Sequence, residues 1–127
     1  MKITMAALLS LKPLQEKLKT QIFPVKTTYK FSKLFKRVNE EAEFYTEEVN
    51  KIIDQYAVKG EDGKPRQNES GNGILLKPET IEVAQRKFSD LTNLEIDFDD
   101  IQFTLDELND IKLSVEEFGY LLPFINE

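Results

Sequence analysis

The chain has no cysteine, no histidine and no tryptophan among its 127 residues. The absence of cysteine excludes a disulfide framework, a thiolate metal site and a cysteine nucleophile. The absence of histidine removes the commonest general base, the Ser-His-Asp arrangement and the usual zinc ligands. We therefore expect no catalytic residues, no metal site and no cofactor, and we interpret the protein as non-enzymatic.

Long hydrophobic runs are missing as well. The apolar run near the start covers only residues 5–9 and is closed by Ser10, Lys12 and Pro13, whereas a membrane span needs about 20 residues. No small-x-small cleavage site follows this run, which argues against a secretory signal. We expect no membrane association and a cytoplasmic location.

The composition is that of a globular protein, with 40% hydrophobic and 31% charged residues. A chain of this length is the usual size of one domain. We predict a single α+β domain over residues 1–127, with a helical part (1–57), a polar loop (58–73) and a mixed part (74–127). Its expected architecture is one long amphipathic helix, shorter N-terminal helices, and a small antiparallel sheet with short helices in the C-terminal half.

Charge is distributed unevenly along the chain. Residues 1–38 carry a net charge of +8, so residues 39–127 carry −14. The two regions either solvate opposite ends of one compact domain or form a dipolar surface for self-association or a matched partner. We count Lys33, Lys36 and Arg37 as candidate interaction residues. Direct nucleic-acid binding is not expected, because the acidic remainder would repel phosphate.

Helical periodicity dominates the first half. Leucines and Ile22 recur at three- and four-residue steps over residues 4–22, with Pro13 predicting two short helices or a kink. From residue 27 to 56 the spacing is 4-3-4-3-4-3-4, a heptad seam on a helix about 45 Å long. The seam consists of Phe31, Phe35, Val38, Ala42, Tyr45, Val49, Ile52 and Tyr56.

The second half mixes several signals. Asp62-Gly63 and Asn72-Gly73 are turn dipeptides within the polar loop, which predicts a long loop or a loose hairpin. Residues 74–77 are expected to form a short strand, and a helix begins at Pro78. Alternating apolar residues over 94–105 predict a half-buried strand with a turn or bulge at Asp99-Asp100. A capping box from Ser114 to Glu117 opens a final helix.

Two further groups are candidate interaction sites. Phe44 lies off the seam, so it either packs under the C-terminal part or anchors a partner. Glu95, Asp97 and Asp99 alternate along the predicted strand, so all three would point to the same face, and Asp100 follows them. They either form a solvated face that discourages edge pairing or hold a hard cation. These acidic candidates are Glu95, Asp97, Asp99 and Asp100.

The order of these elements resembles an uncharacterised family of small proteins encoded by tailed bacteriophages and prophages. The residues that carry the resemblance are Phe23-Pro24 and the segments 29–41, 56–64, 88–96, 101–108 and 121–125. The resemblance covers most of the chain, and it implies a viral origin, with a location in the host cytoplasm or the virion. It supplies no catalytic residues.

From these features we predict a phage-derived assembly or interaction protein that acts by protein–protein contact. Its partner is expected to be a phage or host protein, or a second copy in a homo-oligomer. The alternative is an acidic inhibitor that mimics nucleic acid or blocks a host defence protein, since residues 90–110 carry eight acids and no base.

Overall fold

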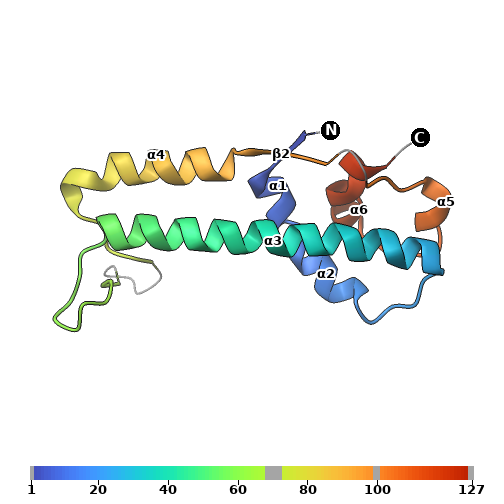
Figure 1. Ribbon diagram of the computed structural model, residues 1–127, viewed down its shortest axis with the longest axis horizontal. Helices are drawn as coiled ribbons and strands as arrows, with labels where there is room; N and C mark the ends of the chain where they lie inside the picture. The colour runs from blue at the N-terminus through green and yellow to red at the C-terminus, as the bar shows by residue number, and fades with distance from the viewer. Residues whose placement is uncertain (1, 68–72, 99–100, 126–127) are drawn as a thin grey trace. The chain divides into compact units, whose positions relative to one another are not determined.

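The computed structural model describes residues 2–67, 73–98 and 101–125. It confirms the α+β class, with one long helix, short N-terminal helices and a two-stranded antiparallel sheet (Figure 1). The contacts divide the chain into two compact units. Unit 1 comprises Met1–Ala42 and Leu94–Glu127, and unit 2 comprises Glu43–Asn93.

Unit 1 begins with the strand β1 (Lys2–Thr4) and two short helices, α1 (Met5–Leu9) and α2 (Lys12–Leu18). The side chain of Thr4 caps α1 by accepting a hydrogen bond from the backbone N–H of Ala7. Pro13 lies in the first turn of α2, where its missing N–H costs nothing. The proline therefore separates two helices, which is one of the two predicted outcomes.

The helix α3 (Val25–Tyr56) is 32 residues long and includes the whole predicted seam. Its N-terminal part belongs to unit 1, and the part from Glu43 onward belongs to unit 2. Seam residues are buried near both ends and only half-buried in the middle. The half-buried ones are Ala42, Tyr45 and Val49.

The sheet differs from the prediction in one strand. We expected it to form within the C-terminal half, but β2 (Glu95–Asp97) pairs with the N-terminal β1, with Ile3 opposite Ile96. Both isoleucines are buried, whereas Glu95 and Asp97 are exposed. A backbone hydrogen bond of 2.8 Å from Met5 to Leu94 extends this link to the start of α1.

The predicted strand over 94–105 is wrong beyond residue 97. A second capping box, formed by Thr104 and Glu107, starts the short helix α5 (Leu105–Leu108), which we did not predict. The capping box at Ser114 and Glu117 opens α6 (Val115–Leu121) as predicted, and the 3-10 helix η2 (Leu122–Phe124) follows. The expected turn at Asp99-Asp100 lies outside the described residues.

The core of unit 1 is assembled from segments far apart in the sequence. Side chains with almost no exposed surface come from α1, α2, the first half of α3, α6 and η2, and from Phe98 and Phe103. Phe31 and Phe103 have ring centroids 4.6 Å apart, and Phe98 meets Phe124 edge-on at 5.4 Å. Such aromatic pairs stabilise the core beyond the effect of removing apolar surface from water.

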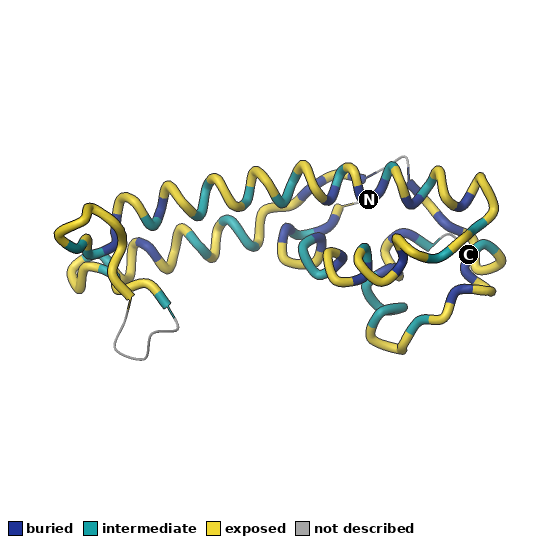
Figure 2. The backbone as a smooth tube through the Cα atoms, turned by 90° about the horizontal axis from the view of Figure 1, so that it is seen from below, coloured by how far each residue is buried: buried dark blue, intermediate teal, exposed yellow. Residues whose placement is uncertain are grey.

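Unit 2 is a helical hairpin. The second half of α3 leads through a loop and the 3-10 helix η1 (Pro78–Thr80) into α4 (Ile81–Thr92), which runs back alongside it. Its buried core includes Ile52, Tyr56 and Ala84, with Leu76, Phe88 and Leu91 packed around it as partly buried residues. Exposed positions dominate the outer surface of both helices (Figure 2).

The loop that joins the two helices is a loose hairpin, one of the two predicted forms. Its three segments are linked in a ring by backbone hydrogen bonds of 2.8 Å, in which Val58 donates to Leu75, Leu75 to Arg66, and Arg66 to Val58. Gly63 has φ 78°, as expected for the Asp62-Gly63 turn. The predicted strand at 74–77 is reduced to isolated bridges at Ile74 and Leu76.

Candidate functional site

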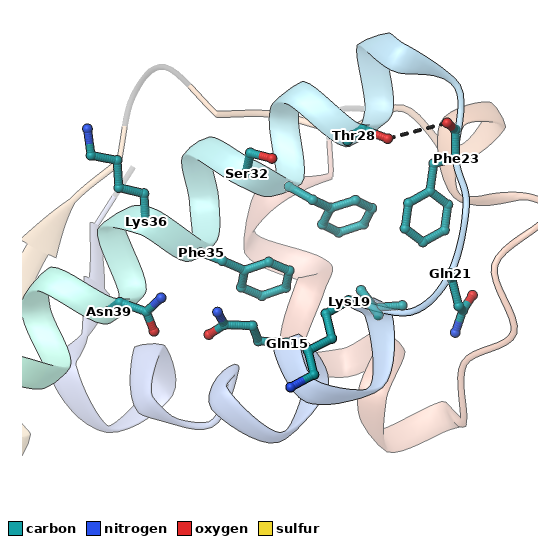
Figure 3. A pocket seen from close by; sticks show the side chains of 11 residues that line it. Gln15, Lys19, Gln21, Phe23, Thr28, Ser32, Phe35, Lys36 and Asn39 are labelled. Atoms are coloured by element: carbon teal, nitrogen blue, oxygen red, sulfur yellow. Dashed lines mark hydrogen bonds between the residues drawn. The ribbon is translucent and has the colours of Figure 1, made fainter.

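The clearest concavity lies in unit 1, between α2 and the first turns of α3 (Figure 3). We call it the α2–α3 groove. It has a volume of about 530 Å³, within the range of natural ligand pockets. Its apolar floor is formed by Leu18, Phe23, Phe31 and Phe35.

Local sequence explains this floor. Phe31 and Phe35 are one helical turn apart and stack with centroids 5.8 Å apart. Phe23 comes from the link before α3 and lies 5.4 Å from Phe31. The hydroxyl of Thr28 donates a 3.3 Å hydrogen bond to the Phe23 carbonyl, which holds the link against the helix.

The rim of the groove is polar. Amide and hydroxyl groups surround the aromatic floor, from Gln15, Gln21, Asn39, Thr28 and Ser32. Two cations, Lys19 and Lys36, line it as well, and no carboxylate does. Lys19 is 2.6 Å from Glu16, whereas the described residues provide no ion-pair partner for Lys36.

The outer lip of the groove exposes apolar side chains. Val25 and Tyr29 occupy the same helical stripe as Ser32 and Lys36, and are 86% and 64% exposed. Ile22, in the link just before α3, is almost fully exposed. Scattered surface hydrophobics are ordinary, but three within eight residues beside an aromatic groove form a patch.

The basic candidate residues lie on one side of α3, where Lys33, Lys36 and Arg37 line a small concavity of about 260 Å³ together with Glu40 and Ile101. Lys36 lines the groove, whereas Arg37 lies 4.9 Å above the Phe98 ring and forms a 3.0 Å ion pair with Glu41. The ammonium of Lys33 lies 5.7 Å from the Tyr29 ring centroid. The structure therefore brings the three basic candidates together beside Glu40, and Arg37 also contributes to packing.

Two of the four acidic candidates lie within the described residues. Glu95 and Asp97 lie on the exposed face of β2, and Glu95 is 4.0 Å from Lys2. Asp99 and Asp100 lie outside the described residues. Within the described ranges, no group of three or more acidic side chains could hold a metal ion.

Phe44 is in unit 2 and is 42% exposed. It lies on a different side of α3 from the buried contact residues Ile52 and Tyr56. Packing against the C-terminal part and a role as a partner anchor both stay predictions for this residue.

Two ion pairs join the basic N-terminal region to the acidic C-terminal region of unit 1. The ammonium groups of Lys30 and Lys17 lie 2.6 Å from Glu107 and Glu117, the glutamates of the two capping boxes. Each glutamate oxygen also accepts a hydrogen bond from the backbone N–H of its cap residue. Through these two pairs, the basic N-terminal region contacts the acidic C-terminal region within unit 1, whereas our first interpretation placed the two regions at opposite ends of the domain.

These contacts shift the acidity of both glutamates. Burial raises the pKa of Glu107, but the Lys30 ammonium and the Thr104 backbone N–H outweigh it and hold the pKa below 4.5. The Lys17 ammonium and the Ser114 N–H lower the pKa of Glu117 below the same value. The Ser/Thr-x-x-Glu spacing could have revealed α5, but the sequence does not indicate which lysine pairs with which glutamate.

Sequence reasoning did not identify the groove. The signal it could have used is the concentration of aromatic residues at positions 23, 29, 31 and 35, although α2 supplies the opposite wall. Among the described helices, none is both long and apolar enough to cross a membrane. Comparisons with protein-family models, curated proteins and solved structures find no match to this chain.

Proposed function

We propose that this is a non-enzymatic interaction protein that binds an acidic segment of a partner protein in the α2–α3 groove. The observation that carries the proposal is the combination of an aromatic floor with the exposed lip of Val25 and Tyr29. Aromatic side chains beside a pocket are typical of the residues that dominate binding energy at protein interfaces.

The chemistry of the lining defines the segment that would fit. One large apolar side chain would fill the space above Phe31 and Phe35, where it would be removed from water. The amides at the rim can hydrogen-bond to the backbone of an extended peptide. Lys36 and Lys19, without a lining carboxylate, favour acidic residues beside the apolar anchor.

The resemblance to small tailed-phage proteins supplies the biological setting of this proposal. It implies a phage or host protein as the partner, met in the host cytoplasm or in the virion, and a role in assembly. No step of the proposal requires catalysis, in keeping with a chain that has neither cysteine nor histidine.

The acidic region is less suited to the alternative function, that of an acidic inhibitor. Glu107 is engaged by Lys30, and Glu95 lies near Lys2, so part of the acidic region is neutralised by the chain itself. A nucleic-acid mimic would instead present its carboxylates to the partner.

The test uses ¹⁵N-labelled full-length protein and two synthetic peptides, one with leucine flanked by glutamates and one with leucine flanked by lysines. We expect the acidic peptide alone to shift the amide resonances of α2 and residues 21–36, and less so at high salt. Equal shifts with both peptides, or none with either, would refute the proposal.

A matched pair of variants tests the lip. Val25 and Val115 are both the first residue of a helix and are 86% and 92% exposed, but only Val25 belongs to the lip. We expect Val25→Asp to weaken binding of the acidic peptide at least tenfold and Val115→Asp to leave it unchanged. Equal effects would place the binding surface elsewhere.

A further inference from the structure

Unit 2 carries a second surface, independent of the groove, on one side of the α3–α4 hairpin. In α3 the positions at this side follow a helical i, i+3, i+4, i+7 pattern, and in α4 they follow i, i+4, i+7, i+11. None of them is charged. We call this set the uncharged face; it consists of Thr46, Val49, Asn50 and Ile53 in α3, and Ile81, Gln85, Phe88 and Thr92 in α4.

Helix geometry places both stripes on the same side of the hairpin. In α3, Ile53 directly follows the buried Ile52, and in α4, Gln85 directly follows the buried Ala84. Each stripe is therefore rotated by about 100° around its helix axis from the buried residues at which the two helices meet. The rotation has the same sense in both helices when each is viewed from its N-terminus. Because the two helices run in opposite directions, this rotation leads to the same side in both.

The apolar residues of the uncharged face are incompletely covered. Ile81 is 39% exposed, and Val49, Ile53 and Phe88 are half-buried. The polar positions between them carry only amides and hydroxyls. Interface cores are depleted of charged residues in the same way.

The opposite side of the hairpin has a different character. Its stripes follow the same helical spacings but include four charged residues, among them Lys51 paired with Glu48 at 3.0 Å. We call this set the charged face; it consists of Phe44, Glu48, Lys51 and Gln55 in α3, and Val83, Lys87 and Asp90 in α4. Charged residues make up 31% of the chain, so a face of eight positions without any stands out.

We propose that the uncharged face binds the same face of a second copy, so that two hairpins form a four-helix bundle. A charged partner would form no ion pair with this face, whereas a second copy presents apolar and amide groups that match it. The chain has a net charge of −6, and pairing through the face without charge avoids placing like charges directly opposite each other. A two-fold axis makes such a contact self-complementary.

The size of the face sets the strength of the contact. Twelve residues of α4 span about 18 Å, and two helices side by side are about 20 Å wide. The face therefore offers about 360 Å² per copy, below the size of stable interfaces and in the range of weak, reversible ones. We infer a dimer that forms with rising concentration and dissociates on dilution.

Sedimentation equilibrium of the full chain, from about 10 μM to about 1 mM, tests the proposal. Ile81→Glu places a charge on the uncharged face, and Val83→Glu places the same charge on the charged face. The two positions are in the first turn of α4 and are 39% and 44% exposed. We expect Ile81→Glu to raise the dissociation constant at least tenfold and Val83→Glu to leave it within twofold.

Cross-linking provides a readout that does not depend on the stability of the Ile81 variant. Because the chain has no cysteine, Gln85→Cys and Arg86→Cys each introduce a single thiol, on the uncharged face and away from it. With a short bis-maleimide we expect a covalent dimer from Gln85→Cys and little from Arg86→Cys. A monomer at about 1 mM, equal effects of the two glutamates, or equal cross-linking would each overturn the proposal.

Discussion

Val38 and Val49 lie on the same helix and the same predicted seam, yet Val38 has no exposed surface and Val49 is half-buried. The difference reflects the two units. In unit 1, α1, α2 and the C-terminal segments surround α3, whereas in unit 2 a single helix packs against it. A continuous apolar stripe therefore shows that a helix has a buried side, but the number of neighbouring elements decides how deep the burial is.

The largest expected effect comes from placing a charge at these two valines. Val38→Asp would bury an unpaired carboxylate and should lower the free energy of unfolding by about 4 kcal/mol or more. Val49→Asp can turn its carboxylate toward water and should cost about 1 kcal/mol. Urea unfolding at low protein concentration, with hydrogen exchange to locate the change, measures both. Equal losses would mean that the two units are equally well packed.

The next largest effect is expected at Glu107, which has no equivalent among the residues of unit 2 that the structure describes. Glu107→Gln removes the charge that Lys30 contacts at 2.6 Å and weakens the capping box of α5. We expect a loss of about 2 kcal/mol, because hydrogen bonds to charged groups are stronger than neutral ones. Glu48→Gln is the control in unit 2, where the exposed pair with Lys51 should contribute less than about 0.5 kcal/mol. An unchanged free energy of unfolding in Glu107→Gln would show that this capping box does not stabilise the fold.

Unit 2 depends on a backbone feature at Gly63. Its φ of 78° lies in the left-handed region, and no atom lies within 4 Å of where a Cβ would stand. Gly63→Ala should therefore destabilise the loop by about 1 kcal/mol through backbone strain alone. Gly119→Ala is the control, since Gly119 lies in α6 with equally open space and ordinary helical geometry, and alanine should stabilise it. Thermal unfolding compares the two.

The smallest expected effect comes from lowering the pH, which should weaken unit 1 before unit 2. The pKa values of Glu107 and Glu117 lie below the ordinary 4.5, so both carboxylates stabilise unit 1 above that pH. This contribution is lost as the pH falls below 4.5 and through the folded-state values. We expect faster amide exchange in α5 and α6 in that range, and a smaller change in the Glu107→Gln variant. Loss of protection in α4 before α5 and α6 would contradict this order.

The sequence predicted those elements whose signals are local. The heptad spacing located α3, Pro13 separated α1 from α2, and Ser114 with Glu117 marked the start of α6. β1 was missed because Lys2–Thr4 is only three residues long, and its partner β2 is close to the other end of the chain. α5 was missed because the alternation of Ile101 and Phe103 outweighed the capping box at Thr104.

The groove shows the same limit. Phe31 and Phe35 were expected on the buried seam, and both are buried. That they also form the floor of a concavity depends on how α2 and the link through Phe23 pack against them. Periodicity gives the buried side of each helix, but it does not give the space left between two helices of different length.

The division of unit 1 by an inserted hairpin has a consequence for the order of folding. β1 and β2 must find each other across a loop that includes all of unit 2. If the hairpin forms first, it draws the two ends of residues 43–93 together and roughly halves the loop left to close. Since each doubling of loop length costs about 0.6 kcal/mol, early hairpin formation would speed closure about threefold. Early formation of unit 2, the less deeply buried unit, would thus speed the folding of unit 1, the better packed one.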